Sequence, residues 1–480
     1  MKILFASAEV APFAKVGGLA DVAGSLPLAL AELGHDVRVI MPKYPSVTQG
    51  AEAGKWELWR AVPGVPVPLA GWTSGCALDE SRLPGSEVPI YFVEHDDYFS
   101  RAGIYGPPGG AYPDNLERLT FFCRAVLAVL EPLGWTPDLL HLNDWHTSLL
   151  AVYLQGVAPA TVFTIHNLGP AYQGTFPLAK LPVTCLPEGS AAAQQFIVDG
   201  QINLAAAGVA CANMVSAVSP TYAREIAEET FSGDLAPLVK KRGQDVQGIL
   251  NGIDYVAWNS ATDSALPAAF DAQTPAGKAQ CKAALQEEAG LPVRADVPLI
   301  GLVTRLDEQK GLDLVAEALD MLPEMQMVVL GTGAPDLEKI FAAAAEKNDN
   351  LAVWLKFSDP LARRIYAGSD LFLMPSRYEP CGLGQMIAMR YGTLPVVRAT
   401  GGLADSVTEK AKRGQKQNGF VFTDYSADEL LEALKRAGEA FADQAKWAGL
   451  VQNAFATDFT WTRSAQDYVK LYEAALGKKS

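Results

Sequence analysis

The chain has few cysteines, and their spacing shows no pairing. Its 480 residues include six cysteines, and no two of them form a C-x-x-C pair. This scatter indicates neither a disulfide framework nor a zinc site, and it favours a reducing, cytoplasmic compartment. Histidine is scarce as well, with five residues, and no H-E-x-x-H or similar motif occurs. We therefore expect no metal ion and no other cofactor.

Basic residues are the minority charge. Lysine and arginine total 39 against 54 acidic residues, which gives a formal net charge of −15. A nucleic-acid backbone requires a broad basic surface, so this composition argues against a nucleic-acid partner. A small anionic ligand is not excluded, because a few cations gathered at one site are enough to hold it.

Long apolar runs are also missing. The first apolar run ends at Glu9 and is too short for a signal peptide. Residues 200–223 carry no charge, but amide side chains and a proline interrupt them. We therefore expect no membrane span and no membrane partner.

Short apolar segments alternate with helix-like segments along the whole chain. Because the strand-like segments are continuously apolar, a parallel sheet covered on both faces is favoured, which is an α/β fold. The expected strands of the first half are 2–8, 37–42, 89–95, 138–144, 160–166 and 214–219. Those of the second half are 297–304, 326–331, 351–357, 370–375, 394–398 and 419–423.

The length predicts two or three domains. Residues 258–277 are rich in Ser, Thr, Ala and Pro and lack strand periodicity, so we interpret them as a connection. An N-terminal domain is then expected over 1–257 and a second over 278–455. The final fifty residues are expected to be helical.

The pentapeptide GGLAD occurs at 17–21 and again at 401–405. Each copy is expected to begin a helix, and the match is either coincidence or a sign of two similar strand-to-helix turns. In the first copy, Lys15 precedes Gly17 and Gly18, and backbone amides at a helix start attract anions. We favour an anion or sugar contact there over a plain tight turn.

Two cations follow the first strand of the second half. Arg305 and Lys310 lie in that loop, just before a helix that Gly311 is expected to open. We favour diphosphate binding over a solvated charge pair, because open α/β sheets bind ligands at strand carboxyl ends. Gly333, in the sequence GTG after the next strand, would allow a nucleotide to approach the backbone.

A carboxylate stands ahead of another expected helix. Glu379 precedes Cys381, and we expect the helix to start at Gly382. The carboxylate and the amides of Gly382 and Leu383 would supply both acceptors and donors, as a sugar requires. The alternative is a simple N-terminal charge. Cys381 is expected to contact the ligand without thiol chemistry.

Two histidines end or occupy strands. His166 ends the strand 160–166 and is predicted to form a hydrogen bond with a ligand, whereas His141 is predicted to be a core residue with its polar atoms satisfied.

Eight motifs resemble those of bacterial glycogen synthases and plant starch synthases, which are retaining glucosyltransferases of the GT-B fold. They cover essentially the whole chain: KVGGLADV (15–22), LNDWH (142–146), TIHNL (164–168), AVSPTYAREI (217–226), LNGID (250–254), TRLDEQKGLDL (304–314), PSRYEPCGLGQ (375–385) and RATGGLADSV (398–407). The resemblance implies two Rossmann-like domains facing a deep cleft, with residues 456–480 returning to the first domain. It also implies transfer of glucose from ADP-glucose to the non-reducing end of an α-1,4-glucan, with retention and without a metal, by a monomer or small homo-oligomer.

The resemblance also assigns roles to residues. The catalytic group would be Lys15, His166, Arg305, Lys310 and Glu379. The donor would be held by Lys15, Gly17, Gly18, Asn251, Arg305, Lys310, Gly333, Phe357, Glu379, Cys381, Gly382, Leu383, Thr400 and Gly401. Asp21 and Asp144 would lie on the acceptor side.

Three positions depart from the family pattern. Ile387 stands where related families have a second glutamate, which puts a carboxylate contact to ribose in doubt. Gly384 stands where a threonine is common, and Phe357 stands where a tyrosine is common. Phe357 can still stack on a base but has no hydroxyl group.

Other functions remain open. A related GT-B transferase could use UDP-glucose or make a small glucoside. A non-catalytic glucan-binding protein could keep the fold, although such a protein is expected to have lost some of the cationic loops. A hydrolase is disfavoured, because no convincing pair of carboxylates is evident.

Overall fold

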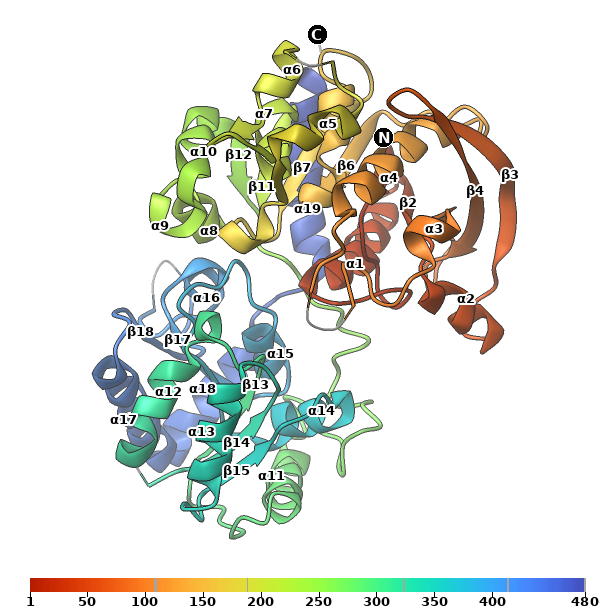
Figure 1. Cartoon of the computed structure of the whole chain (residues 1–480). Coiled ribbons are helices and arrows are strands. Elements are labelled where there is room, and N and C mark those ends of the chain that lie inside the picture. Colours follow the sequence, from red (N-terminus) through yellow and green to blue (C-terminus); the bar gives the residue numbers. More distant parts are fainter. Residues whose placement is uncertain (108–109, 188, 323, 412–413, 479–480) are drawn as a thin grey trace. The chain divides into compact units, whose positions relative to one another are not determined.

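The computed structural model describes residues 1–107, 110–187, 189–322, 324–411 and 414–478. The chain forms two compact units (Figure 1), one built from Met1–Gly252 and Trp461–Ser480 and the other from Ile253–Thr460. Each unit has a largely or wholly parallel sheet covered by helices, so the predicted α/β class is confirmed.

In the described residues, the main sheet of the first unit has nine strands in the order β12-β11-β7-β6-β1-β2-β5-β4-β3. Their bounds are β1 (Lys2–Ala6), β2 (Asp36–Pro42), β3 (Trp59–Pro68), β4 (Thr73–Arg82), β5 (Pro89–Glu94), β6 (Leu139–Asn143), β7 (Ala160–Ile165), β11 (Met214–Ala217) and β12 (Val246–Gly248). All pairs from β12 to β5 are parallel, and β4 and β3 add an antiparallel hairpin.

Sequence reasoning missed the β3–β4 hairpin. Pro63, Pro66 and Pro68 punctuate β3 and obscure its strand pattern. Proline cannot donate to a strand ladder, so β3 is tolerated because it is the outer strand of the sheet. The same prolines make this edge a poor template for pairing with another chain.

The main sheet of the second unit, as far as the structure describes it, has six parallel strands in the order β15-β14-β13-β16-β17-β18. Their bounds are β13 (Leu299–Val303), β14 (Gln326–Leu330), β15 (Leu351–Trp354), β16 (Leu371–Met374), β17 (Leu394–Arg398) and β18 (Phe420–Phe422). The order along the chain reverses between β13 and β16. In the first unit the corresponding reversal lies between β1 and β6. Doubly wound sheets bind ligands at the carboxyl ends of the strands beside this reversal.

Helices cover both sheets. Those of the first unit are α1 (Gly18–Glu32), α2 (Pro45–Glu52), α3 (Asp96–Phe99), α4 (Asn115–Val129), α5 (Leu149–Tyr153), α6 (Ala191–Gln194), α7 (Leu204–Cys211), α8 (Pro220–Glu225), α9 (Glu229–Ser232), α10 (Ala236–Arg242) and α19 (Trp461–Gly477). Those of the second are α11 (Ala276–Glu288), α12 (Leu312–Ala318), α13 (Pro335–Ala345), α14 (Asp359–Gly368), α15 (Gly384–Arg390), α16 (Gly401–Ser406), α17 (Ala427–Ala442) and α18 (Gln444–Ala456).

The uncharged stretch 200–223 is divided among several short elements. It contains β10 (Gln201–Asn203), which pairs with β8 (Thr175–Pro177) and β9 (Ile197–Val198), and then α7 and β11. Among the described residues, no helix is both long and apolar enough to cross a membrane.

The C-terminal helix α19 belongs to the first unit. It packs against α1, β7 and β11, and Figure 1 shows it in blue among the warm-coloured elements of that unit. The fully buried His141 lies 2.6 Å, from Nδ1, from the hydroxyl of Tyr472 on α19 and 2.6 Å, from Nε2, from Oγ1 of Thr164. His141 is therefore a satisfied core residue, as predicted.

Residues 258–277 are ordered and belong to the second unit. Ser260 donates to the carbonyl of Phe270, and both are buried. Arg363 on α14 lies over the ring of Trp258, 4.3 Å from its centroid, and donates to the carbonyl of Ala257.

Candidate active site

The loop after β1 carries Lys15 and leads into α1. The Lys15 ammonium lies 2.6 Å from Oδ1 of Asp21, one turn into the helix. The two side chains are 50% and 34% exposed, so Lys15 remains open to solvent while it is paired. The two residues were predicted for the donor and acceptor sides, and the structure brings them together.

Glu9, which sequence reasoning treated only as the end of an apolar run, organises this loop. Its Oε2 accepts the N–H groups of Val16, at 2.6 Å, and Gly17, at 3.1 Å. Its Oε1 accepts the hydroxyl of Tyr105 at 2.6 Å. Burial of Glu9 raises the pKa of its carboxyl. The Gly17 amide that we expected to meet an anion is therefore already bound to an internal carboxylate.

Asp144 follows β6, on the other side of the strand-order reversal. Its backbone has φ of 53°, which non-glycine residues rarely adopt. Its Oδ1 accepts the backbone N–H of His166 at 2.7 Å. Burial raises the pKa of Asp144 to about 7, although its backbone hydrogen bonds oppose the shift. A strained backbone and a half-buried acid together are typical of functional sites.

His166 is held in one tautomer by its neighbour. The Asn143 side chain donates to the carbonyl of Ala6 at 3.0 Å, which leaves its Oδ1 as the acceptor for the His166 ring at 2.9 Å. Nε2 of His166 is then the donor, and its Nδ1 carries a lone pair. Burial lowers the pKa of His166 to about 3, so the ring is neutral at pH 7. His166 can accept a hydrogen bond from a hydroxyl through Nδ1.

Asn251 lies between β12 and the end of the first unit. Its side chain is 5% exposed, and among the described residues its Oδ1 has no hydrogen-bond partner. A buried acceptor without a donor is costly, so a ligand hydroxyl would satisfy this atom.

In the second unit, the loops after β13 and β16 meet. Nζ of Lys310 lies 2.7 Å from Oε2 of Glu379, and the hydroxyl of Ser376 donates to the same oxygen at 3.0 Å. The side chains of Lys310 and Glu379 are 19% and 7% exposed. Two predicted site residues that are 69 positions apart therefore form one largely buried ion pair.

Arg305 occupies the outer part of the same loop. It pairs with Asp307 at 3.1 Å, and its side chain is 60% exposed. Asp307 also accepts the backbone N–H of Lys310 at 3.0 Å, which fixes the turn that carries both cations. Gly311, with φ of 73°, caps α12, and an added Cβ would lie 2.1 Å from the carbonyl oxygen of Pro375.

The turn after Glu379 differs from the prediction. Helix α15 begins at Gly384 rather than at Gly382, because Gly382 has φ of 71° and cannot be helical there. Gln385 is fully buried and donates to the carbonyls of Cys381, at 3.1 Å, and Gly382, at 2.9 Å. Cys381 is 6% exposed. Gln385 thus fixes the turn, a role that sequence reasoning did not assign.

The second GGLAD copy is closely packed. Both copies do begin helices, as predicted. However, Gly401 has φ of 44°, and a Cβ there would lie 1.9 Å from the carbonyl oxygen of Glu379. Gly402 donates to that same oxygen at 3.1 Å. By contrast, a Cβ at Gly17 would have no heavy atom within 4 Å. The first glycine of each copy therefore differs in backbone conformation and in surroundings. Thr400, just before the second copy, is buried.

The GTG sequence is also explained by packing. A Cβ at Gly331 would lie 1.8 Å from the carbonyl oxygen of Thr304, and one at Gly333 would lie 2.2 Å from that of Leu306. The Gly333 N–H donates to Glu338 at 2.8 Å. Close approach to the Arg305 loop therefore accounts for both glycines, and the predicted contact of Gly333 with a nucleotide stays a prediction.

The three residues that depart from the family pattern differ in how deeply they are buried and in what they contact. Phe357 is 92% exposed, so its ring is available for stacking. Ile387 is 5% exposed and faces the interior of its unit. A Cβ at Gly384 would lie 2.9 Å from the ring of Phe372, so this ring occupies the space that a larger side chain at position 384 would need.

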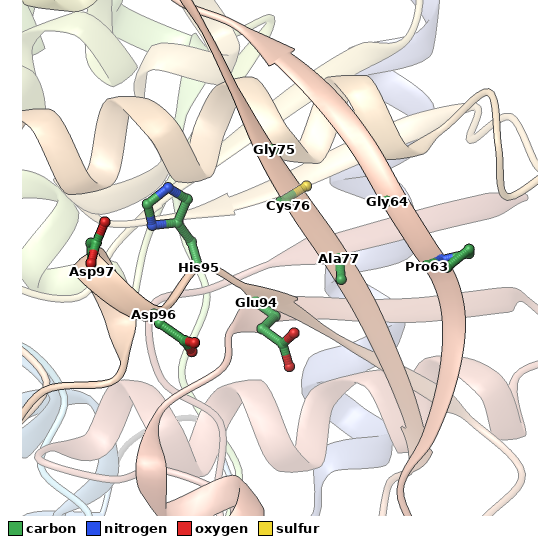
Figure 2. Close-up of a pocket in the computed structure, with 9 residues that line it drawn as sticks. All are labelled: Pro63, Gly64, Gly75, Cys76, Ala77, Glu94, His95, Asp96 and Asp97. Atoms are coloured by element: carbon green, nitrogen blue, oxygen red, sulfur yellow. The ribbon is translucent and has the colours of Figure 1, made fainter.

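A separate pocket of about 540 Å³ lies at the carboxyl end of β5 (Figure 2). It is lined by Pro63, Gly64, Gly75, Cys76, Ala77, Glu94, His95, Asp96 and Asp97. Glu94 already pairs with Lys43 and Arg60. The pocket contains none of the predicted site residues, and no group of metal-binding side chains occurs in the described part of the chain.

Comparisons with known proteins agree across the full length. The family model described as "Starch synthase catalytic domain" matches residues 2–241, and "Glycosyl transferases group 1" matches residues 286–448. A glycogen synthase from Geotalea daltonii is 43% identical over 100% of both chains. One from Anaeromyxobacter dehalogenans is 48% identical over 98% of this chain and 99% of its own.

Solved structures give the same result. The catalytic domain of starch synthase IV from Arabidopsis thaliana, bound to ADP and acarbose, matches with a TM-score of 0.87 and 34% identity over 99% of both chains. A sucrose-phosphate synthase from Thermosynechococcus elongatus matches with a TM-score of 0.61 and 19% identity over 98% of both chains, and it supports the fold alone. The chain therefore belongs to the glycogen synthase and starch synthase family of glycosyltransferases, with the GT-B fold.

Proposed function

We propose that this glycogen synthase uses ADP-glucose and elongates an α-1,4-glucan at its non-reducing end with retention and without a metal. The observation that carries the proposal is the ion pair of Lys310 with Glu379 beside the strand-order reversal of the second unit. It puts a cation for a phosphate next to an acceptor for sugar hydroxyls. The relative solved with bound ADP supports adenosine diphosphate as the leaving group.

The cations have distinct tasks in this proposal. Arg305 offers a planar fork for the diphosphate, and Lys310 supplies a point charge. Lys15 adds a third cation from the first unit. All three stabilise the negative charge that develops on the departing nucleotide, which is electrostatic catalysis.

Sugar recognition falls to hydrogen-bonding groups. Glu379, the backbone after Cys381 and the Nδ1 lone pair of His166 would contact the donor glucose. Asp144 and Asp21 would orient sugar on the acceptor side. Phe357, fully open to solvent, would stack on the base.

The proposed reaction proceeds on one face of the sugar. The bond between the anomeric carbon and the phosphate oxygen breaks, and the acceptor hydroxyl oxygen bonds to that carbon from the same side. The departing phosphate takes the hydroxyl proton, so neither a catalytic base nor a second carboxylate is required. The configuration at the anomeric carbon is retained.

Incubation with ADP-glucose and a maltooligosaccharide in the presence of EDTA tests the proposal. We expect release of ADP, longer oligosaccharides, and α-linkages by proton NMR. A metal requirement or a β-linkage would refute the corresponding part. Competition with UDP-glucose identifies the nucleotide, and no transfer from any nucleotide sugar would refute the whole.

A non-catalytic glucan-binding protein is the rival. In the variants Lys310→Ala and Glu379→Ala we expect turnover to fall far more than glucan affinity. Equal losses would favour the rival. We also propose a cytoplasmic monomer or small homo-oligomer, consistent with six free cysteines. Light scattering on the purified protein measures the oligomeric state.

A further inference from the structure

Glu9 is a buried carboxylate at the carboxyl end of the first strand. It is 4% exposed and lies between β1 and α1. Each of its oxygens has a separate task, since Oε2 accepts the amides of Val16 and Gly17 and Oε1 accepts the hydroxyl of Tyr105. Three hydrogen-bond donors from two parts of the chain thus meet at one side chain.

We propose that Glu9 is a positioning residue that fixes the backbone at Val16 and Gly17 and thereby sets the place of the Lys15 ammonium. The inference rests on the proposed function, in which Lys15 contacts the donor. Glu9 itself touches no substrate. It acts through the loop, because the residue it holds directly follows Lys15.

The alternative is that Glu9 occupies an anion site until a phosphate displaces it. Its surroundings argue against displacement. Tyr105, which holds Oε1, is itself stacked on His146 with ring centroids 4.8 Å apart. The loop is also closed at its start, where Ala14 donates to the carbonyl of Val10 at 3.0 Å.

The charges around Glu9 also argue against its displacement by a phosphate. The charge of Asp21 raises the pKa of Glu9, and the charge of Glu9 raises the pKa of Asp144, so the three carboxyls lie near one another. Lys15 is the basic side chain of this loop, and it pairs with Asp21. A phosphate in place of Glu9 would sit among acids, so the positive charge of this half-site comes from the Lys15 ammonium and not from the loop amides.

Two variants separate the possibilities. In Glu9→Gln, the amide oxygen can replace Oε2 and still accept both N–H groups, while the amide nitrogen can donate to the Tyr105 hydroxyl. In Glu9→Ala both contacts are lost. Asp79→Asn is the matched control, since Asp79 is also 4% exposed in the same unit but pairs with Lys43 and Arg60 on another part of the sheet.

Trypsin cleavage after Lys15 reports the order of the loop without any need for activity. The next residue is Val16, whose N–H is held by Glu9. In Glu9→Ala we expect cleavage at this bond to accelerate by about tenfold to a hundredfold, because the hydrogen bonds to a charged group that oppose local opening are lost. Glu9→Gln should restore most of the protection, and Asp79→Asn should not change it.

Kinetics and ADP binding complete the test. We expect kcat of Glu9→Ala to fall by about tenfold to a hundredfold, as for a misplaced catalytic group, with partial rescue in Glu9→Gln and no fall in Asp79→Asn. The Kd for ADP, measured by calorimetry, should stay the same or rise. Tighter ADP binding in Glu9→Ala would show that Glu9 is a displaceable occupant and would overturn the inference.

Failure of the inference is distinguishable from failure of the proposed function. An inactive wild-type protein refutes the function, whereas the trypsin result still decides whether Glu9 orders the loop. If the wild type transfers glucose and Glu9→Ala matches it in both kcat and cleavage, the function stands and the positioning role falls.

Discussion

Variants of the ion pair between Lys310 and Glu379 can separate its contribution to the free energy of unfolding from its contribution to turnover. Lys310→Ala leaves a carboxylate that is 7% exposed and that still accepts a hydrogen bond from the Ser376 hydroxyl. Removing one partner of a buried pair costs about 3–5 kcal/mol. Because the Lys310 side chain is 19% exposed and water can partly replace it, we expect a loss of about 2–3 kcal/mol in the free energy of unfolding.

The double variant Lys310→Ala with Glu379→Gln removes both charges. The side-chain amide oxygen introduced at position 379 can still accept a hydrogen bond from Ser376. We therefore expect the free energy of unfolding to return to within about 1 kcal/mol of the wild-type value. Turnover should not return. Losing a group that stabilises charge in the transition state costs about a hundredfold to a thousandfold in kcat, and this loss is independent of the carboxylate.

Urea denaturation followed by circular dichroism gives the stabilities, and ADP release gives the rates. A double-mutant cycle then yields the coupling in each quantity. If the double variant recovers turnover together with stability, Lys310 serves only to neutralise Glu379 and the catalytic assignment is wrong. If Lys310→Ala is as stable as the wild type, the pair is not formed in the free protein.

Three further predictions follow from single positions. Burial raises the pKa of Asp144 to about 7, so wild-type stability is lost as the pH rises through this value. The free energy of unfolding of Asp144→Asn, relative to that of the wild type, should therefore rise by at most about 4 kcal/mol from pH 4 to pH 8 in urea denaturation. The same difference between variant and wild type at pH 4 and at pH 8 would refute this. Gly401→Ala should lose about 1–3 kcal/mol, because its φ is positive and its Cβ would meet the Glu379 carbonyl, whereas Gly17→Ala should stay within about 0.5 kcal/mol. Phe357→Ala, at a side chain 92% exposed, should keep the melting temperature and raise KM for the donor; an unchanged KM would exclude stacking.

The regular part of the fold was predictable because buried parallel strands are continuous apolar runs. Strands such as β13 and β16 appear in the sequence as LIGLV and LFLM and are found where they were expected. The β3–β4 hairpin was not predictable in this way. Its outer strand alternates and contains prolines, and only its place at the sheet edge makes that pattern acceptable.

Some residues of the candidate site could likewise be predicted from the sequence, and others could not. Arg305, Lys310 and Glu379 follow strand ends in the chain, so the topology rule locates them without coordinates. Glu9 and Gln385 could not be found, because their roles depend on hydrogen bonds to backbone atoms of turns whose shape the sequence does not reveal. The sequence also does not separate a glycine that a ligand would contact from one required by packing, as Gly401 is against the carbonyl of Glu379.

The paired cations explain how an acidic chain could keep the proposed phosphate-binding groups ready. Lys15 pairs with Asp21, Arg305 with Asp307 and Lys310 with Glu379. The first two cations are at least half exposed, and such pairs contribute only about 0–1 kcal/mol, so each of these cations can leave its own carboxylate for an anionic ligand at little cost.

Lys310 differs because its pair is largely buried, and separating it would leave Glu379 without its cation. An ammonium group has three N–H donors, and Glu379 needs only one of them. Lys310 should therefore stay on Glu379 when the phosphate arrives and bind both at once. In the proposed function Glu379 contacts the sugar and Lys310 contacts the phosphate, so their ion pair would hold the bond to be broken at both ends as one preformed unit.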